Sequence, residues 1–448
     1  MAEVIEGEDL KRLGEFTFKE VSKRVDDASV IASLILERMV RFSNNSITVT
    51  KKNENFEVFI YLSKDKKRFL GSTSNLKEES LKNFIDKLIK ACESSKESED
   101  YTPLEKAPLP FSEHYNFDER IAKGYVDLVD LANSGINSAL KWANRVAGSL
   151  LSLTNYSYIL TTSGVERDDK ATQITINIRA FTEKEISGHG LSCSSNSRGL
   201  DVEKAGREAG EHALNSKRRG NWEEGKYEVL YSPTVSADLF QHIGYFSSAY
   251  AIEIGISFLV DKLDSKVAVE DFSLSDSALV YGALNSRVFD DEGYVSGNTK
   301  IIEKGLLKGY LHNLTTAKKF NTKSTGNAGI IEPSPWNLIV EGGNSTYDDM
   351  VKSMKKGLIV TNNWYTRFQN LREGAFSTLP RDATYLVEDG EIKHSIAGLR
   401  ITDSLPRMLK EIDEMSKERR WIKWWEVEIP VLSPWVKVKD VLITKAEG

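Results

Sequence analysis

Cysteine is nearly absent from this chain, since only Cys92 and Cys193 occur in 448 residues. Two cysteines cannot build the disulfide framework of a small secreted domain, so we expect both to be reduced thiols. The first eight residues are acidic and lack the basic cap and apolar run of a secretory signal. The best apolar run, residues 30–40, contains a glutamate and an arginine and is shorter than the roughly 20 residues of a membrane span. These absences predict a cytoplasmic protein with no membrane-spanning segment.

Histidine is scarce as well, and its spacing excludes the most common zinc-hydrolase motif. Zinc hydrolases bring imidazoles or carboxylates together on one ion, most familiarly through H-E-x-x-H on a helix. No two of the six histidines lie within five residues of each other. The chain also lacks G-x-S-x-G, G-x-x-x-x-G-K-[ST], G-x-G-x-x-G and C-x-x-C. The sequence therefore gives no linear motif for a helical zinc site, a serine nucleophile elbow, nucleotide binding or thiol redox chemistry.

Charge gives no sign of nucleic-acid binding. The chain has 60 basic and 66 acidic residues, for a net charge of −6. Nucleic-acid binding needs a basic footprint, and the overall balance provides none. One local run, residues 417–425, mixes basic residues with three tryptophans. Aromatic side chains of this kind can stack on bases. The acidic neighbours favour a C-terminal strand whose tryptophans fill a core or a subunit interface.

Residue patterns predict a mixed first half. Apolar spacing indicates helices up to residue 26, over 76–92, from about 118, and over 202–214 with Asp201 as N-cap. β-Branched and aromatic residues indicate strands at 47–50 and 56–61, separated by a polar turn at 52–55, and further strands up to residue 179.

The second half is predicted to be dominated by sheet. After residue 227, short β-rich segments alternate with glycine turns. The few predicted helices lie near residue 240 and over 317–320, 347–354 and 405–415. We therefore expect an α+β fold with two domains: an N-terminal mixed α/β domain, 1–219, and a C-terminal β-rich domain with few helices, 220–448. A charged and proline-containing stretch, 93–112, is the clearest linker-like segment.

Several short blocks share the order and spacing of one protein family. They are YEVLYSP at 227–233, SFLVDKL at 257–263, FDDEG at 289–293, IEKGLLKGYL at 302–311, STGNAG at 324–329 and LVEDGEI at 386–392, with weaker echoes at 41–45 and 162–165. In these blocks the chain resembles the TldD/PmbA family, once called modulators of DNA gyrase. The resemblance covers nearly the whole chain and is strongest from residue 227 onward.

The resemblance implies a metalloprotease site that this chain does not carry in full. In the TldD branch, an H-E-x-x-x-H segment and a distal cysteine bind zinc, and the enzyme cleaves unstructured peptides. An ungapped register from Leu230 puts Phe240 and Tyr245 at the two histidine positions and Gln241 at the glutamate position. The C-terminal segment would supply the distal cysteine, and residues 420–425 in it contain none. Phenylalanine and glutamine cannot act as zinc ligand and base at neutral pH, and a tyrosine phenol titrates near 10.

The chain thus resembles the PmbA (TldE) branch, for which the resemblance implies the role of partner subunit. We expect no zinc, no other cofactor and no catalytic residue in this chain, with zinc in the partner. His242 is poorly placed to replace the missing ligand, because two helical positions rotate it by about 200° onto another face, and it would need Asp or Glu ligands from elsewhere. We expect it to be a partly buried histidine bonded to a backbone carbonyl or a partner chain.

Two further groups are candidates for a peptide cleft or subunit contact. Asp290, Glu292 and Gly293 belong to a carboxylate-rich run, for which a hairpin turn closed by Gly293 is the simplest interpretation. Ser324, Thr325, Gly326 and Asn327 form a loop whose backbone N–H groups could face a bound chain or carboxylate. A plain tight loop explains the second group equally well. His242 is the remaining candidate for such a contact.

The expected function is a PmbA/TldE-like subunit of a cytosolic TldD/TldE-type metalloprotease complex that degrades or processes unstructured peptides. In a heterodimer with a zinc-bearing homologue, this subunit would stabilise and gate a peptide cleft rather than cleave. Two alternatives stay open at this point. One is a non-enzymatic homodimer that binds peptides or a protein. The other is a metalloprotease in its own right that uses ligands outside the motif.

Overall fold

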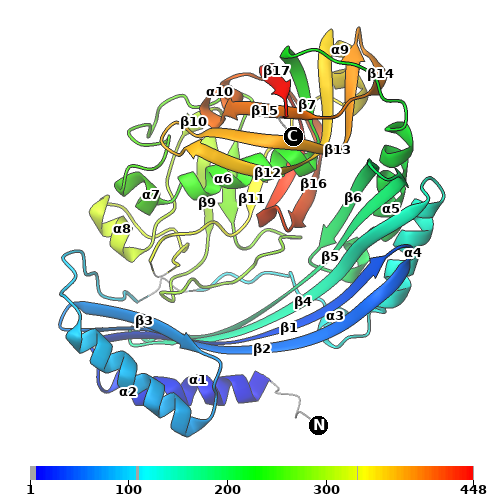
Figure 1. Ribbon diagram of the computed structural model, residues 1–448. Helices are drawn as coiled ribbons and strands as arrows, with labels where there is room; N and C mark the ends of the chain where they lie inside the picture. The colour runs from blue at the N-terminus through cyan, green and yellow to red at the C-terminus, as the bar shows by residue number, and fades with distance from the viewer. Residues whose placement is uncertain (1–6, 107–109, 330, 447–448) are drawn as a thin grey trace.

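The chain folds into two β-sheets with helices packed around them. A computed structural model describes residues 7–106, 110–329 and 331–446. The first half of the chain forms a long curved sheet, and the second half forms a larger sheet that sits above its concave face (Figure 1). This is the predicted mixed α+β fold, with few helices in the second half.

The N-terminal sheet has six antiparallel strands in the order β3-β2-β1-β4-β5-β6. Four strands, β1, β2, β4 and β5, are unusually long, and each pairs with at least one neighbour along almost its whole length. The strands are β1 (Asp27–Ser43), β2 (Ser46–Lys64), β3 (Lys67–Thr73), β4 (Arg145–Thr161), β5 (Glu166–Glu183) and β6 (Ile186–Ser194).

Helices cover the convex face of this sheet in two groups. Two of them, α1 (Gly7–Ser22) and α2 (Glu78–Ser94), pack under one end (Figure 1). At the other end α4 (Leu128–Leu140) and α5 (Val202–Asn215) pack on each other and on β5 and β6, beside the short α3 (Glu119–Ala122). Asp201 caps α5 by accepting a hydrogen bond from Lys204 N at 2.9 Å, which confirms the predicted start of that helix.

The C-terminal sheet has eleven strands, and its order is β10-β9-β8-β11-β17-β15-β13-β12-β7, with β14 on β13 and β16 on β17. Strand β17 also pairs with β7, so β17, β15, β13, β12 and β7 close into a ring. The strands are β7 (Gly225–Tyr231), β8 (Leu274–Ser277), β9 (Asn298–Glu303), β10 (Leu306–Leu307), β11 (Leu338–Val340), β12 (Lys356–Asn370), β13 (Ala375–Glu388), β14 (Glu391–Ser395), β15 (Leu399–Ser404), β16 (Ile412–Trp424) and β17 (Val427–Lys445).

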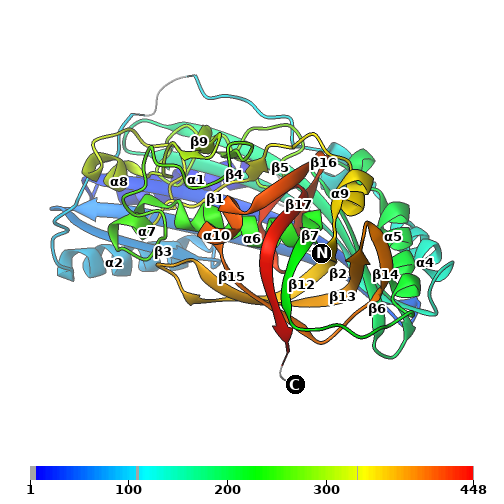
Figure 2. The same ribbon diagram turned by 90° about the horizontal axis from the view of Figure 1, so that it is seen from above.

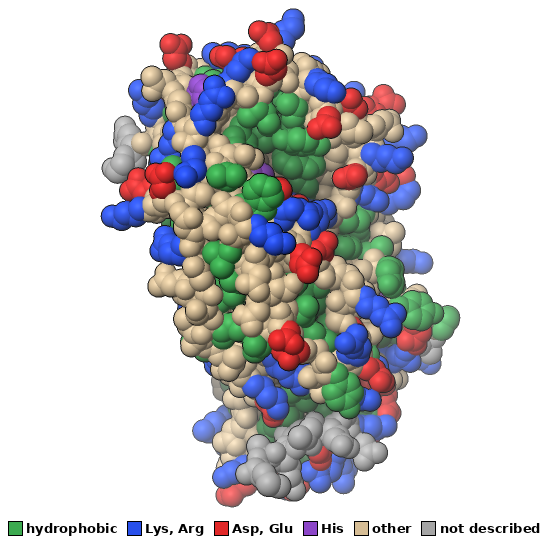
Figure 3. Space-filling view, turned by 90° about the vertical axis from the view of Figure 1, so that its right-hand side faces the viewer, with side chains coloured by type: hydrophobic (Ala, Val, Ile, Leu, Met, Phe, Trp, Pro, Cys, Tyr) green, Lys and Arg blue, Asp and Glu red, His purple; other side chains and the backbone are tan. Residues whose placement is uncertain are grey.

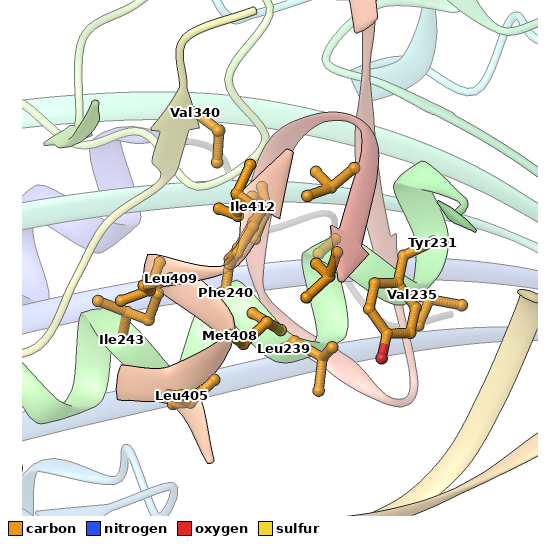
Figure 4. Packing of buried hydrophobic residues seen from close by; sticks show 14 of the residues in the cluster. Tyr231, Val235, Leu239, Phe240, Ile243, Val340, Leu405, Met408, Leu409 and Ile412 are labelled. Carbon is orange, nitrogen blue, oxygen red and sulfur yellow. The ribbon is translucent and has the colours of Figure 1, made fainter. Parts of the chain in front are cut away.

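One helix, α6 (Pro233–Phe246), runs through the main core of this half (Figure 2). The other helices are short: α7 (Ala249–Glu253), α8 (Leu314–Lys319), α9 (Tyr347–Ser353) and α10 (Leu405–Lys410). The side chains of α6 point into a cluster formed with α10, β11 and β16, in which Phe240 and Ile412 lie close together (Figure 4). The core of the second half is therefore built around the helix that carries the three motif positions.

The two halves meet through apolar side chains at one end of the N-terminal sheet. Ile31 and Ile159 of that sheet pack against Val288 and Phe289 of the second half. Residues 100–104 lie across the same junction, where Asp100 forms ion pairs with Arg68 of β3 and with Lys319 of α8 at 2.6 and 2.8 Å. The proposed linker-like segment thus contacts both halves. A domain boundary near residue 220 stays a prediction.

Two local predictions were wrong for the same reason. The polar stretch 52–55 is no turn, since β2 continues through it while pairing with β1; the turn lies at Asn44 and Asn45, which have φ of 49° and 70°. The helix predicted over 405–415 ends at Lys410, because residues from Ile412 onward pair with β17 as strand β16. In both places long-range strand pairing overrides the local residue pattern.

No helix among residues 7–106, 110–329 and 331–446 is long and apolar enough to cross a membrane. On the face drawn in Figure 3, basic and acidic side chains alternate over the surface, and hydrophobic side chains gather in a hollow in the upper half. This mixture agrees with the nearly balanced charge of the sequence.

Candidate functional site

Helix α6 holds the three motif positions in a fixed and mostly buried frame. Ser232 caps the helix by accepting a hydrogen bond from Val235 N at 3.3 Å, and Pro233 occupies the first turn, where its missing N–H costs nothing. Twelve of the fourteen helix residues are buried. A helix buried on all sides takes its orientation from the surrounding core. The surrounding core therefore fixes which residues each buried side chain of α6 contacts.

Phe240 faces the apolar core. Its side chain is 0% exposed, and its ring centre lies 5.3 Å from that of Phe272. The ring carbons offer no lone pair to a metal ion. Phe240, which the predicted register places at the first motif histidine, is thus a packing residue in this chain.

Gln241 uses both ends of its amide to hold the turn between β16 and β17. Its Nε2 donates to Glu426 O at 2.6 Å and to Asp238 Oδ1 at 3.1 Å, while its Oε1 accepts from Glu428 N at 2.8 Å. Its side chain is buried. A carboxylate could only accept hydrogen bonds and would have no donor for Glu426 O. Gln241, which the predicted register places at the motif glutamate, is therefore a structural clamp on the turn.

Tyr245 lies at the rim of the same region. It is 38% exposed, and its hydroxyl donates to Glu428 Oε2 at 3.5 Å. Partial burial raises the pKa of its phenol to about 12, with a further contribution from the Glu428 carboxylate. Gln241 and Tyr245 thus both reach the start of β17, whereas Phe240 points elsewhere.

His242 packs between aromatic rings. Its ring centre lies 4.7 Å from that of Phe368 and 6.2 Å from that of Tyr245. Burial lowers the pKa of its imidazole to about 4, so it is neutral at physiological pH. The expected hydrogen bond to a backbone carbonyl is not formed within the described part of the chain. Within the described residues, the aromatic contacts of His242 are with Tyr245 and Phe368 and not with the loops around Asp290 and Ser324, which hold the other predicted cleft residues.

A buried acid that the sequence reasoning missed lies beneath Gln241. Asp238 Oδ2 accepts from Asn363 Nδ2 at 2.6 Å and from Thr366 Oγ1 at 2.5 Å. Desolvation by burial raises the pKa of this carboxyl to about 6 despite these donors. Its position three residues before Gln241 on the same helix is a signal that helical spacing could have revealed. Asp238 couples α6 to β12 and to the turn that Gln241 holds.

The acidic run and the glycine loop come together in the structure. Asp290 Oδ2 accepts from Ala328 N at 3.0 Å, and Asp291 N donates to Ala328 O at 3.0 Å. Gly326 has φ of +70° and packs so closely that an added Cβ would lie 2.0 Å from Val295 O. Asn327 Nδ2 donates to Asp276 Oδ2 at 2.6 Å. These contacts join the two loops into one rigid unit.

The carboxylates of Asp290 and Glu292 accept hydrogen bonds from backbone N–H groups of the neighbouring chain segments. Asp290 Oδ1 accepts from Glu292 N and Tyr294 N at 3.0 and 2.9 Å, and Glu292 Oε2 accepts from Leu314 N at 2.8 Å. Burial raises the pKa of Asp290 to about 7 and raises that of Glu292 well above its usual range, with the neighbouring carboxylate adding to the second shift. Gly293, with φ of +78°, closes the turn between Phe289 and Val295. An added Cβ at Gly293 would lie 2.8 Å from Thr161 Cγ2, so the turn rests on the N-terminal sheet.

Ser324 and Thr325 face a groove on the outer side of the same loop. Both hydroxyls hydrogen-bond to His312 O at 3.2 Å, and the Thr325 hydroxyl also accepts from His312 N at 2.8 Å. The groove has a volume of about 570 Å³ and includes His312 in its lining. The sequence reasoning did not single out His312. Within the described ranges, no three His, Cys, Asp or Glu side chains are arranged to hold a metal ion, at this groove or at any other place.

Two sequence models of one protein family match this chain. The sequence profile of the PmbA/TldA metallopeptidase C-terminal domain matches residues 224–445, and that of the PmbA/TldA metallopeptidase central domain matches residues 112–217. The chain belongs to the PmbA/TldD metallopeptidase family.

Curated relatives and solved structures agree with this assignment. A metalloprotease of Methanocaldococcus jannaschii is 28% identical over 218 residues, 47% of this chain and 48% of the relative. A metalloprotease PmbA homolog of Haemophilus influenzae is 30% identical over 185 residues, 41% of this chain and 40% of the relative. The chain therefore matches about half of the length of these relatives. TldE from Thermococcus kodakarensis shares the fold, with a TM-score of 0.85 and 20% identity over 97% of this chain and 99% of that chain.

Proposed function

We propose that this chain is the PmbA/TldE-like, zinc-free subunit of a TldD/TldE-type metalloprotease and that it acts on unstructured peptides only together with a zinc-bearing homologue. The observation that carries the proposal is the Gln241 clamp. Gln241 stands at the proposed position of the catalytic glutamate, and both ends of its amide bond the β16–β17 turn. Its Nε2 donates to Glu426 O at 2.6 Å, and its Oε1 accepts from Glu428 N at 2.8 Å. A group bound in this way cannot orient a water molecule for attack.

The neighbouring positions support the same proposal. Zinc needs three protein donors around an open position in a catalytic site. Phe240 supplies no donor, and the phenol of Tyr245, with its pKa near 12, stays protonated at neutral pH. The donor set at the motif positions of this chain does not fit a zinc ion. The TldE likeness of the fold supports a partner role.

The test is a reconstitution with the zinc-bearing homologue from the same cell. The two subunits are purified separately and mixed, and hydrolysis of a casein-derived unstructured peptide is followed. The proposal predicts turnover only in the mixture. Turnover should vanish when the motif glutamate of the homologue is changed to glutamine. It should persist within about twofold in Tyr245→Phe, which keeps the ring and removes the hydroxyl at the second histidine position.

A variant with the motif residues restored provides a second test. The triple variant Phe240→His, Gln241→Glu, Tyr245→His restores the motif letters, yet it should stay inactive on its own because the distal cysteine is also missing. Robust hydrolysis by this variant alone would show that one region suffices, and it would contradict the proposal. Hydrolysis by the unaltered chain alone would contradict it directly.

A further inference from the structure

The outer edge of β2 is open over much of its length. Strand β3 pairs with β2 only from Val58 to Lys64, while β1 pairs with β2 on the other side. Residues 46–57 therefore have no strand on their outer side, and no turn or loop of the described residues makes a backbone hydrogen bond with them. None of these residues is buried. In Figure 1, β2 is the lower border of the curved sheet, away from the C-terminal sheet.

This open edge is long and regular. A typical strand has about five or six residues, so the open part of β2 is about twice as long. It contains neither proline nor glycine, and residues 49–57 pair with β1 without a bulge. Short strands, proline and bulges are common means by which proteins prevent edge pairing. The open edge of β2 therefore keeps the geometry of a strand that can accept another strand.

The charges on this edge decide what can pair with it. Lysines on an edge strand ordinarily discourage pairing, and the edge carries Lys51 and Lys52. Here Glu54 follows Lys52 by two positions, so these two side chains lie on the same face of the sheet, with their charged atoms 2.6 Å apart. The Lys52 side chain is 54% exposed, and ion pairs at exposed positions contribute little. The edge thus presents a positive and a negative group side by side.

We propose that a second copy of this chain pairs with residues 49–57 as an antiparallel strand, around a two-fold axis at Asn53. Residues opposite each other in an antiparallel pair share a face, so such an axis passes through a residue. With the axis at Asn53, Lys52 of each copy lies opposite Glu54 of the other. An axis at Lys51 or Lys52 would set lysine against lysine, and an axis at Glu54 would set glutamate against glutamate. Charge complementarity therefore favours a second copy in this one register.

The paired copies would share one continuous sheet, built from the two six-stranded sheets. A two-fold axis normal to the sheet keeps both C-terminal halves on the same face. A single pair of edge strands is a small interface, so we expect a Kd on the order of micromolar and a dimer that dissociates on dilution. The pairing needs neither zinc nor the homologue and does not rest on the proposed function.

The test uses the purified chain alone, and analytical ultracentrifugation measures its mass over a range of concentrations. The mass should rise to twice that of one copy as the concentration passes the Kd. Lys52→Glu and Glu54→Lys should each raise the Kd by about tenfold or more, because each sets like charges opposite each other. An equimolar mixture of these two variants should dimerise again, because opposite charges then face each other. Lys51→Glu is the matched control and should change the Kd by less than about threefold, since Lys51 would lie opposite Asn55.

Engineered cysteines test the register. Asn53→Cys should give disulfide-linked dimers on mild oxidation with diamide, because the two Cα atoms at the axis would lie about 4.5–5.5 Å apart. Asn55→Cys is the matched control, because its two Cα atoms would lie about 14 Å apart, too far for a disulfide. The native cysteines, Cys92 and Cys193, are both buried.

A chain that stays monomeric at about a hundred times the expected Kd would overturn the inference. Equal cross-linking of the Asn53→Cys and Asn55→Cys chains would overturn it as well. So would equal weakening by Lys51→Glu and Lys52→Glu, or a mixture of the two charge variants that fails to dimerise. Since zinc and the homologue are absent from this experiment, each of these results leaves the reconstitution test of the proposed function untouched.

Discussion

Replacing Gln241 by glutamate should destabilise the protein in a pH-dependent way. The glutamine amide donates to Glu426 O at 2.6 Å and to Asp238 Oδ1 at 3.1 Å. An ionised glutamate only accepts, so both acceptors would lose their donor at about 1–3 kcal/mol each. It would also bring a second carboxylate against Asp238, whose own pKa is raised to about 6 by burial. We therefore expect a loss of about 2–6 kcal/mol in the free energy of unfolding at pH 7.5.

The sign of the pH effect follows from the pKa of the new carboxyl. Burial beside Asp238 should raise this pKa above its unfolded value of about 4.3. A group of this kind contributes stability that is present below the unfolded pKa and is lost as the pH rises through the folded pKa. At pH 5 the protonated side chain regains one O–H donor. The loss should therefore be smaller at pH 5 than at pH 7.5, changing by at most about 1.4 kcal/mol for each pH unit within that window.

The assay is denaturant unfolding followed by tryptophan fluorescence at both pH values. Gln369→Glu is the matched control, because Gln369 lies exposed near the end of β12. That substitution should change the free energy of unfolding by less than about 0.5 kcal/mol, as surface changes usually do. The reasoning would be refuted by a Gln241→Glu variant as stable as the parent at pH 7.5, or by an equal loss at both pH values.

Three further predictions follow from packing, backbone and charge. Phe240→Ala should cost about 3–5 kcal/mol in unfolding free energy, since the ring is 0% exposed, and a loss below 1 kcal/mol in denaturant unfolding would count against its core position. Gly326→Ala should lower the melting temperature clearly more than Gly164→Ala, because both have positive φ but only Gly326 would press a Cβ against Val295 O; equal shifts would speak against the close contact. The pKa of Asp100 is held near 2, so its ionised form stabilises the fold above about pH 4, and this stabilisation is lost as the pH falls toward 2. Asp100→Asn should therefore remove part of the stability that the protein loses on acidification. An unchanged acid unfolding curve would contradict this prediction.

The sequence predicted the fold class and most helices, but not the strand register. Patterns of apolar residues place α5 and α9 within one residue of the observed bounds, because these helices are amphipathic or capped locally. The turn expected at 52–55 and the helix expected up to 415 failed where pairing with a distant strand determines the structure. Such pairing has no local signature in a single sequence.

The sequence indicated which residues to examine at the candidate site, but not which contacts they make. The family register singled out Phe240, Gln241 and Tyr245, and their correspondence to the zinc motif stays a prediction. Only the structure relates Gln241 to a turn that lies 185 residues further along the chain. The tryptophans of the basic run behave partly as expected: Trp424 is 7% exposed and packs in the core, while Trp425 is 56% exposed. The groove around His312 could not be found from sequence, because its walls come from segments that the fold alone brings together. The roles of Asp290, Glu292, Gly293 and Ser324–Asn327 in a peptide cleft stay predictions.

Zinc content tests the central claim most directly. The chain would be purified alone and as a mixture with its zinc-bearing homologue, and bound zinc would be measured per subunit together with hydrolysis of an unstructured peptide. The account predicts that zinc and cleavage are found only when the homologue is present, with no more than trace zinc in this chain alone. Stoichiometric zinc and peptide cleavage in the isolated chain would contradict the assignment of Phe240, Gln241 and Tyr245 as structural residues.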